Sequence, residues 1–184
     1  MLEYMDIYDA NRNKTGKTIE RKNKKKVSEG EYTISVHCFI INSKKQILLT
    51  QRNLNKKRGG KWEETHGGLK AGENSIDGII RELQEEIGVS VKSSELKLYS
   101  TIKNKKVFRD IYILYKDVPK QSIKFVDGEV IDCKYVTVSD YKKMIKMGKC
   151  TSRNFNETIF IDKGVLNNTK VWFCSYFMLK WLCK

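Results

Sequence analysis

Three glutamates in the middle of the chain could bind a divalent metal ion. Glu82, Glu85 and Glu86 fall within one arc of about 100° on a helix that turns about 100° per residue. Like charges at these spacings repel by a few tenths of a kcal/mol per pair, and the end of a helix also disfavours anions. Mg²⁺ or Mn²⁺ would turn the repulsion into ligation, because both ions take oxygen ligands and bridge to phosphates. The alternative is an acidic helix face in contact with solvent.

The segment that carries these glutamates predicts an amphipathic helix from Asn74 to Ile87. Its apolar side chains fall in a second arc of about 100°, which we expect to be buried. They are Ile76, Ile79, Ile80, Leu83 and Ile87. Gly88 follows directly, and a glycine just after the last turn is typical of a helix end. The helix should therefore hold its apolar side in a core and present its carboxylates on another side.

The residues around this helix complete a longer motif. Residues 67–89 read GGLKAGENSIDGIIRELQEEIGV, with Gly67, Glu73 and the run from Arg81 to Val89 at fixed spacings. Seven fixed letters at about one in fifteen each would match by chance on the order of once in a hundred million starting positions. The segment resembles the complete box of the Nudix family. That resemblance implies a Nudix-type α/β/α sandwich and hydrolysis of a diphosphate linkage in a nucleoside diphosphate derivative or similar phosphorylated small molecule.

The resemblance also implies roles for the matching positions. The metal ligands would be Glu82, Glu85, Glu86 and the backbone carbonyl of His66, with Mg²⁺ or Mn²⁺ as the cofactor. One of these glutamates, with Glu85 and Glu82 as the candidates, would also activate water. Glu73 and Arg81 would form the ion pair that fixes the helix, and Gly67 would allow the tight turn that enters the box.

Segments on both sides of the box extend the resemblance. GGKWEETHGG is similar to the Trp-containing lead-in of the family, and we expect Trp62, Gly67 and Gly68 to contact the substrate. DGEVIDCKYVTVSD at 127–140 resembles the later segment in which a glutamate completes the metal site or serves as a base. That glutamate maps to Glu129. Asp127 and Asp132 are alternatives if the loop register differs, and an ordinary loop carboxylate is another.

Two other functions remain open. The opening YMDIYDANRNKTGKTIER resembles a subgroup of Nudix proteins related to isopentenyl diphosphate isomerase, which moves a proton instead of hydrolysing. Hydrolysis is favoured because His66 stands where the isomerase has a reactive cysteine, and because the box keeps its full REUxEE pattern. The net charge of +14 suggests an RNA or nucleotide binder or a decapping protein. The chain lacks the interleaved aromatic motif of common RNA-binding modules, which disfavours nucleic acid as a partner.

The rest of the chain must build the scaffold for this site. Strands are predicted at Tyr4 to Tyr8, Lys17 to Arg21, Ile34 to Ile40, Gln46 to Arg52, Leu96 to Thr101, Val107 to Tyr115 and Val130 to Val138. Residues 53–68 are predicted to be loop, and Ser139 to cap a short helix through Met147. His37 is expected to be an ordinary sheet residue, outside any histidine ligand cluster. Strands that arrive mostly as hairpins favour an α/β fold with a mixed sheet and an N-terminal hairpin.

Length and composition indicate one domain over residues 1–184, with the N-terminal hairpin and basic segment at 1–28 and a C-terminal helix at 169–183. The aromatic residues of that helix should pack against the sheet or a partner subunit, which leaves a homodimer open. Its apolar run is shorter than the about 20 residues of a membrane span, so no membrane association is expected. Five scattered cysteines and the absence of a secretory signal favour reduced thiols in the cytoplasm.

Charge is distributed unevenly along the chain. Residues 61–89 carry three basic and seven acidic side chains, whereas the segments before and after them are strongly basic. A basic surround attracts polyanions, while the acidic island would repel them unless a cation were bound there. Alternatively, the lysines of the basic segments mainly increase solubility.

Overall fold

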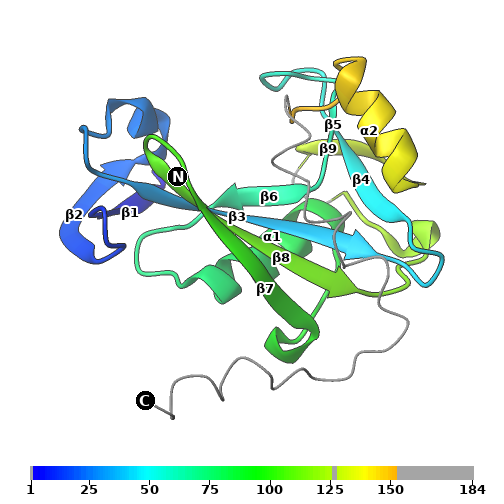
Figure 1. Ribbon diagram of the computed structural model, residues 1–184, viewed down its shortest axis with the longest axis horizontal. Coiled ribbons are helices and arrows are strands. Elements are labelled where there is room, and N and C mark those ends of the chain that lie inside the picture. Colours follow the sequence, from blue (N-terminus) through cyan, green and yellow to red (C-terminus); the bar gives the residue numbers. More distant parts are fainter. Residues whose placement is uncertain (1, 126–127, 153–184) are drawn as a thin grey trace, which may run out of the picture.

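The computed structural model describes residues 2–125 and 128–152, which form nine strands and two α-helices (Figure 1). The strands are β1 (Tyr4–Tyr8), β2 (Lys14–Glu20), β3 (Thr33–Ile41), β4 (Ile47–Arg52), β5 (Trp62–Glu63), β6 (Thr65–Gly68), β7 (Leu96–Lys103), β8 (Val107–Tyr115) and β9 (Val130–Val136). The helices are α1 (Ser75–Ile87) and α2 (Val138–Lys146), and the 3₁₀ segments are η1 (Arg21–Lys26), η2 (Ser93–Glu95) and η3 (Lys120–Ser122). The helix predicted at 169–183 and the alternative base Asp127 lie outside the described residues.

The larger sheet is mixed. Its strands follow the order β5-β4-β3-β8-β7, with β6 also paired to β3 and β9 also paired to β4. β3 and β8 run parallel, whereas the other pairs are antiparallel. Parallel neighbours need a long connection, and the one between these strands carries α1. β1 and β2 form a separate hairpin. The predicted mixed sheet and N-terminal hairpin are therefore confirmed.

Helices cover both faces of the larger sheet. Along β3, Val36 and Ile40 belong to the core that contains Leu83 of α1, while Phe39 belongs to the core that contains Tyr141 of α2. Successive side chains of a strand point to opposite faces, so β3 is buried on both sides and is apolar at most positions. This is the α/β/α arrangement that the resemblance implies.

The predicted hairpin of β3 and β4 opens immediately after its turn. The two strands pair only at Ile41 and Ile47, after which β3 pairs with β6 while β4 pairs with β5 and β9. The prediction that residues 53–68 are all loop is therefore wrong for β5 and β6. These strands are two and four residues long, and pairing with distant partners defines them instead of any local period. Their insertion brings the start of the box next to the middle of β3.

Arg12 ties the N-terminal hairpin to the larger sheet. Its Nη1 donates a hydrogen bond to Asp110 Oδ1 at 2.7 Å, and its Nη2 donates to the other oxygen. The Asp110 side chain is fully buried and also accepts from the Ser75 and Thr101 hydroxyls. Burial alone would raise the pKa of Asp110, but these hydrogen bonds and the Arg12 charge hold it below its usual value. Ser75 begins α1, so one carboxylate joins the hairpin, β8 and the box helix.

Smaller differences from the predictions have local causes. β2 starts at Lys14 instead of Lys17, and the basic run at 21–26 forms η1. The α2 helix is capped by Thr137 and not by Ser139, because the Thr137 hydroxyl accepts from the backbone N–H of Asp140 at 3.1 Å. Within residues 2–125 and 128–152, no helix is both long enough and apolar enough to cross a membrane.

Candidate functional site

Helix α1 places the three glutamates of the box in different environments. Asn74 caps the start of the helix, where its side chain accepts from the backbone N–H of Asp77, and Gly88 caps the end with a φ of 67°. The predicted apolar side is in contact with the core: Ile79, Leu83 and Ile87 are buried, and Ile76 and Ile80 are partly buried. Glu82 and Glu86 are each only 5% exposed, whereas the Glu85 side chain is 43% exposed. A simple solvated acidic face does not describe this helix.

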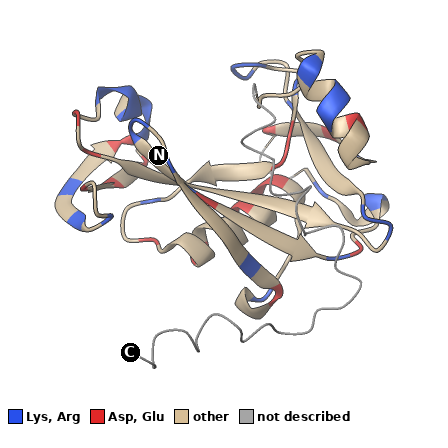
Figure 2. Ribbon diagram, in the orientation of Figure 1, with Lys and Arg blue, Asp and Glu red and all other residues tan. Residues whose placement is uncertain are grey.

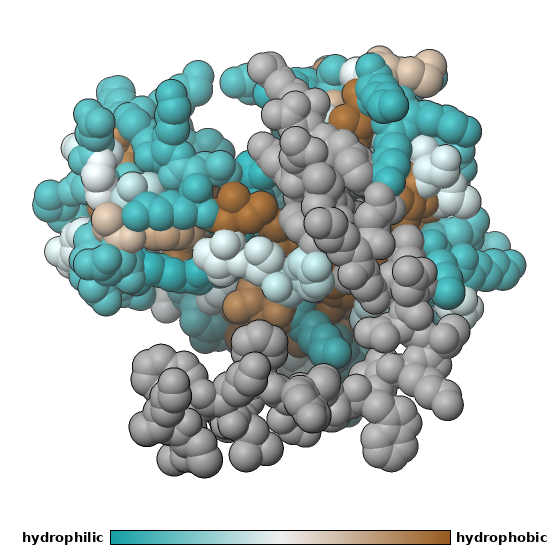
Figure 3. Space-filling view, viewed as in Figure 1, coloured by the Kyte–Doolittle hydropathy of each residue, from teal (hydrophilic) through white to brown (hydrophobic). Residues whose placement is uncertain are grey.

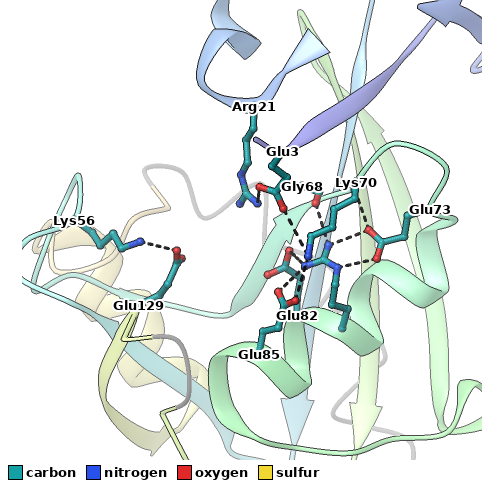
Figure 4. Close-up of polar contacts among 10 residues, drawn as sticks. Glu3, Arg21, Lys56, Gly68, Lys70, Glu73, Glu82, Glu85 and Glu129 are labelled. Carbon is teal, nitrogen blue, oxygen red and sulfur yellow. Dashed lines mark hydrogen bonds and ion pairs between the residues drawn. The ribbon is translucent and has the colours of Figure 1, made fainter. Parts of the chain in front are cut away.

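Arg81 holds three carboxylates of the box, those of Glu73, Glu82 and Glu85, around one guanidinium group. Figure 4 shows these three carboxylates close together. The Nε and Nη2 atoms of Arg81 donate to the two oxygens of Glu73 at 2.7 and 2.9 Å, which is the ion pair predicted from the resemblance. Its Nη1 donates to Glu82 Oε1 and to Glu85 Oε2, both at 2.8 Å. Lys70 adds a second positive charge, with its Nζ 3.2 Å from Glu85 Oε1. Carboxylates from the loop and the helix are thus held together at the end of β6.

Gly67 is required because its backbone lies against the Glu82 carboxylate. A Cβ at this position would lie 1.9 Å from Glu82 Oε1 and 2.0 Å from Glu82 Cδ. Burial raises the pKa of Glu82, and the opposing attraction of Arg81 and Arg21 does not overcome it. A further cation beside Glu82 would therefore stabilise its charged form.

His66 and His37 face each other across β3 and β6. Their rings are stacked, with centroids 4.9 Å apart and planes 7° apart, and Glu64 Oε1 lies 2.9 Å from His37 Nδ1. His37 is a residue of the sheet, as expected, but the β3–β6 register, which the sequence does not display, brings it together with His66 and Glu64. Burial lowers the pKa of His37 to about 4, so its ring is neutral near pH 7. The three side chains could ligate a metal, but Arg58 and Arg109 line the same cavity and disfavour a cation there.

Glu129 lies apart from the glutamates of α1 (Figure 4). Its Oε1 is 2.6 Å from Lys56 Nζ, and it borders the same cavity as His66, Gly67 and Gly68. Burial raises the pKa of Glu129, but the hydrogen bond from Lys56 and the charges of Lys56, Arg21 and Arg52 outweigh burial and lower it. The structure thus brings Glu129 to the cavity of the box without placing it among the carboxylates around Arg81.

Trp62 is held away from this cavity. Its ring is partly buried against the core of α2, and Lys134 Nζ lies 3.8 Å from the ring centroid. Gly67 and Gly68 line the cavity, whereas Trp62 is absent from its described lining. The resemblance of the segment to the family suggested a substrate contact for Trp62, but the pairing with Gln51 that sets the direction of its ring is not visible in the sequence.

The cavity beside the box is basic and has a volume of about 620 Å³. It lies between η1, β3, β6 and β8. Figure 2 shows Lys and Arg on η1 and on the segment before β5, and Figure 3 shows hydrophilic side chains gathered over the N-terminal hairpin and η1. The sequence shows the basic segment within residues 1–28 but does not indicate that it borders the box.

The donor set fits a hard divalent cation. Carboxylate and backbone carbonyl oxygens are the ligands that Mg²⁺ and Mn²⁺ prefer, and Glu82, Glu85 and Glu86 supply three carboxylates on one helix. The close approach of Gly67 leaves no room for a side chain above Glu82. The carbonyl of His66 precedes this glycine directly.

Comparison with known proteins identifies relatives. The model of the NUDIX domain matches residues 31–156. A Nudix hydrolase of Listeria monocytogenes, lmo0368, is 28% identical over 161 residues, which cover 86% of this chain and 94% of the relative. An RNA pyrophosphohydrolase of Ruthia magnifica is 34% identical over 92 residues, 50% of this chain and 49% of the relative. The crystal structure of DR0079 from Deinococcus radiodurans is similar in fold, with a TM-score of 0.72 at 17% identity, over 86% of this chain and 98% of that one.

Proposed function

The chain belongs to the Nudix family, and we propose that it hydrolyses a diphosphate linkage in a phosphorylated small molecule with the help of Mg²⁺ or Mn²⁺. One observation carries the proposal: the complete box is folded so that Glu82 and Glu85 share Arg81 at the edge of a basic cavity. Hydrolysis needs both features, because the carboxylates can hold a cation and the cavity can accept an anionic substrate.

The residues of the box have distinct tasks in this proposal. Glu82, Glu85, Glu86 and the carbonyl of His66 would hold the metal, which would neutralise phosphate oxygens and lower the pKa of a water molecule. Arg81 binds Glu73 through two hydrogen bonds and keeps the loop before α1 fixed to the helix. Gly67 and Gly68 let the substrate approach the backbone of β6 closely.

Glu129 is the candidate base that is not committed to the metal. It borders the cavity, and its lowered pKa keeps it ionised near neutral pH. Its carboxylate would accept the proton of the attacking water after exchanging its contact with Lys56. The other described alternative, Asp132, is 3.2 Å from Lys120 and lies outside the described lining of the cavity.

The structure offers no support for isomerase chemistry of the thiol-dependent kind. The His66 side chain occupies the position before Gly67, and its Nδ1 donates to the backbone carbonyl of Glu64 at 3.0 Å. Within the described part of the chain, Cys38, Cys133 and Cys150 are all buried, and burial raises the pKa of the Cys38 thiol. Buried thiols with raised pKa values are poor nucleophiles and poor acids at neutral pH.

The test is a panel of diphosphate compounds with and without Mg²⁺ or Mn²⁺. It includes nucleoside diphosphate derivatives, nucleoside polyphosphates, RNA with a 5′-triphosphate and isopentenyl diphosphate, with phosphate, monophosphate and isomer formation as readouts. Glu85→Gln should lower kcat by at least about a hundredfold, as expected when a group that stabilises transition-state charge is lost. Glu95→Gln is the matched control, because Glu95 pairs with Lys116 at the distant η2 segment. A folded Glu85→Gln protein with normal turnover would refute the proposed site.

A further inference from the structure

The basic cavity holds more positive charge than one diphosphate needs. Its described lining includes six cationic side chains: Arg21, Lys24, Lys25, Arg52, Lys106 and Arg109. Glu129 is the one carboxylate of that lining, and it is already paired with Lys56. Since a bound metal would neutralise part of the scissile diphosphate, the cations that have no acidic partner remain for other anionic groups.

The cations of the cavity differ in the partners that they already have, and Lys106 donates to the backbone carbonyl of Val27. Arg21 pairs with Glu3 and Arg52 with Glu63, both at 2.6 Å. Among the described residues, the ammonium groups of Lys24 and Lys25 form no ion pair. Desolvation lowers the pKa of Lys24, and the charges of Arg21, Lys57 and Arg52 lower it further. An anion between η1 and β4 would relieve this repulsion.

The chemistry of the lining selects phosphate over other groups. No described lining residue is Phe, Tyr or Trp, so the cavity offers no large ring on which a nucleobase could stack. Its apolar side chains are limited to Met5, Ile34 and Val107, which are too few to bury an isoprenoid chain. The cavity lies between η1 and the sheet, and a flat basic patch would suit a membrane or a long RNA better.

We propose that this cavity binds phosphate groups other than the diphosphate that is cleaved, so that the substrate is a small molecule with three or more phosphates. The proposal rests on the hydrolase function above and specifies its substrate class. Gly67 fixes the reacting end, because it lies against Glu82 and also lines the cavity. The additional phosphates extend from there toward Lys24 and Lys25 on η1. A volume of about 620 Å³ is within the usual range for a small-molecule site.

Binding can be tested without turnover. Inorganic tripolyphosphate represents a linear chain and inositol hexakisphosphate a ring of clustered phosphates, and each is titrated calorimetrically into wild type and into Glu85→Gln without divalent metal. Lys24→Gln/Lys25→Gln should raise the dissociation constant of the better ligand at least tenfold and reduce its dependence on salt. The control Lys44→Gln/Lys97→Gln removes the same charge from exposed positions and should change this dissociation constant less than twofold.

The outcomes separate this proposal from the proposed hydrolysis. Tight binding of either ligand that depends on Lys24 and Lys25 supports the polyphosphate site, even if no compound is hydrolysed. An equal loss of polyphosphate affinity in the two double variants would overturn the proposal. An affinity for inorganic phosphate equal to that for both polyphosphates would also overturn it. Tighter binding of 5′-triphosphate RNA or of anionic vesicles than of both small ligands would also overturn it. Hydrolysis of simple diphosphates alone, without polyphosphate binding, would leave the hydrolase and refute the substrate class.

Discussion

Replacing Gly67 by alanine should separate activity from stability. The new Cβ would lie 1.9 Å from Glu82 Oε1, and real Cβ atoms essentially never come closer than 3.0 Å to such an atom. The carboxylate must therefore move by about 1 Å, a misplacement that can lower the rate about a hundredfold. That factor corresponds to about 2.7 kcal/mol of lost transition-state stabilisation. We therefore expect both kcat/KM and the affinity for Mn²⁺ to fall in Gly67→Ala.

Stability should change much less, because the clashing atoms are the end of a flexible side chain. We expect a cost at the low end of the about 1–3 kcal/mol typical of overpacking, or a fall in Tm of a few degrees. In the Gly67→Ala background, Glu82→Asp shortens the clashing side chain and should recover most of the lost Tm. The assays are steady-state kinetics, Mn²⁺ titration by electron paramagnetic resonance and thermal melting. Normal kcat/KM and Mn²⁺ affinity in Gly67→Ala would refute the assigned role of this close contact.

Two further variants test the hairpin anchor and the candidate base. Arg12→Met should cost about 1.5–3 kcal/mol of unfolding free energy, because Asp110 keeps its charge but loses a charged partner, while Lys17→Met at an exposed pair should cost little. Because the pKa of Asp110 is lowered in the folded protein, the stability that this carboxylate contributes is present above about pH 4 and is lost as the pH falls toward its folded pKa. Arg12→Met removes one cause of that lowering, so its unfolding free energy should fall less between pH 7 and pH 3 than that of wild type, and an equal fall in both proteins would contradict the assignment. Glu129→Gln should lower kcat about a hundredfold with little effect on KM, and Lys56→Gln should move the acidic limb of the kcat profile to higher pH. Unchanged kcat in Glu129→Gln would return Glu129 to an ordinary loop carboxylate.

The box was predictable because its signals are local. Helix period, the Gly88 end and the Glu73–Arg81 spacing all lie within 23 residues. Interactions three and four residues apart on a helix follow from geometry that no distant segment changes. The alternation of residues 34–40 likewise indicated a strand, although only the structure shows that both of its faces are covered.

Features that depend on pairing between distant segments could not be read in the same way. The stacking of His37 on His66 follows from the β3–β6 register, and the position of Trp62 follows from its pairing with Gln51 of β4. Neither register is encoded in a period that a four-residue or two-residue strand can display. The resemblance suggested a substrate contact for Trp62, whereas the fold packs its ring against the core that contains α2.

The fold brings together charged segments that are far apart in the sequence. The basic run at 21–26 precedes the box by more than 40 residues, yet η1 and Gly67 border one cavity. The basic cavity attracts an anionic substrate, whereas the neighbouring carboxylates of Glu82 and Glu85 repel it. A divalent ion at the carboxylates removes that repulsion without occupying η1. Anion binding at Lys24 and Lys25 should therefore survive metal removal, whereas productive placement of a diphosphate against Gly67 should not.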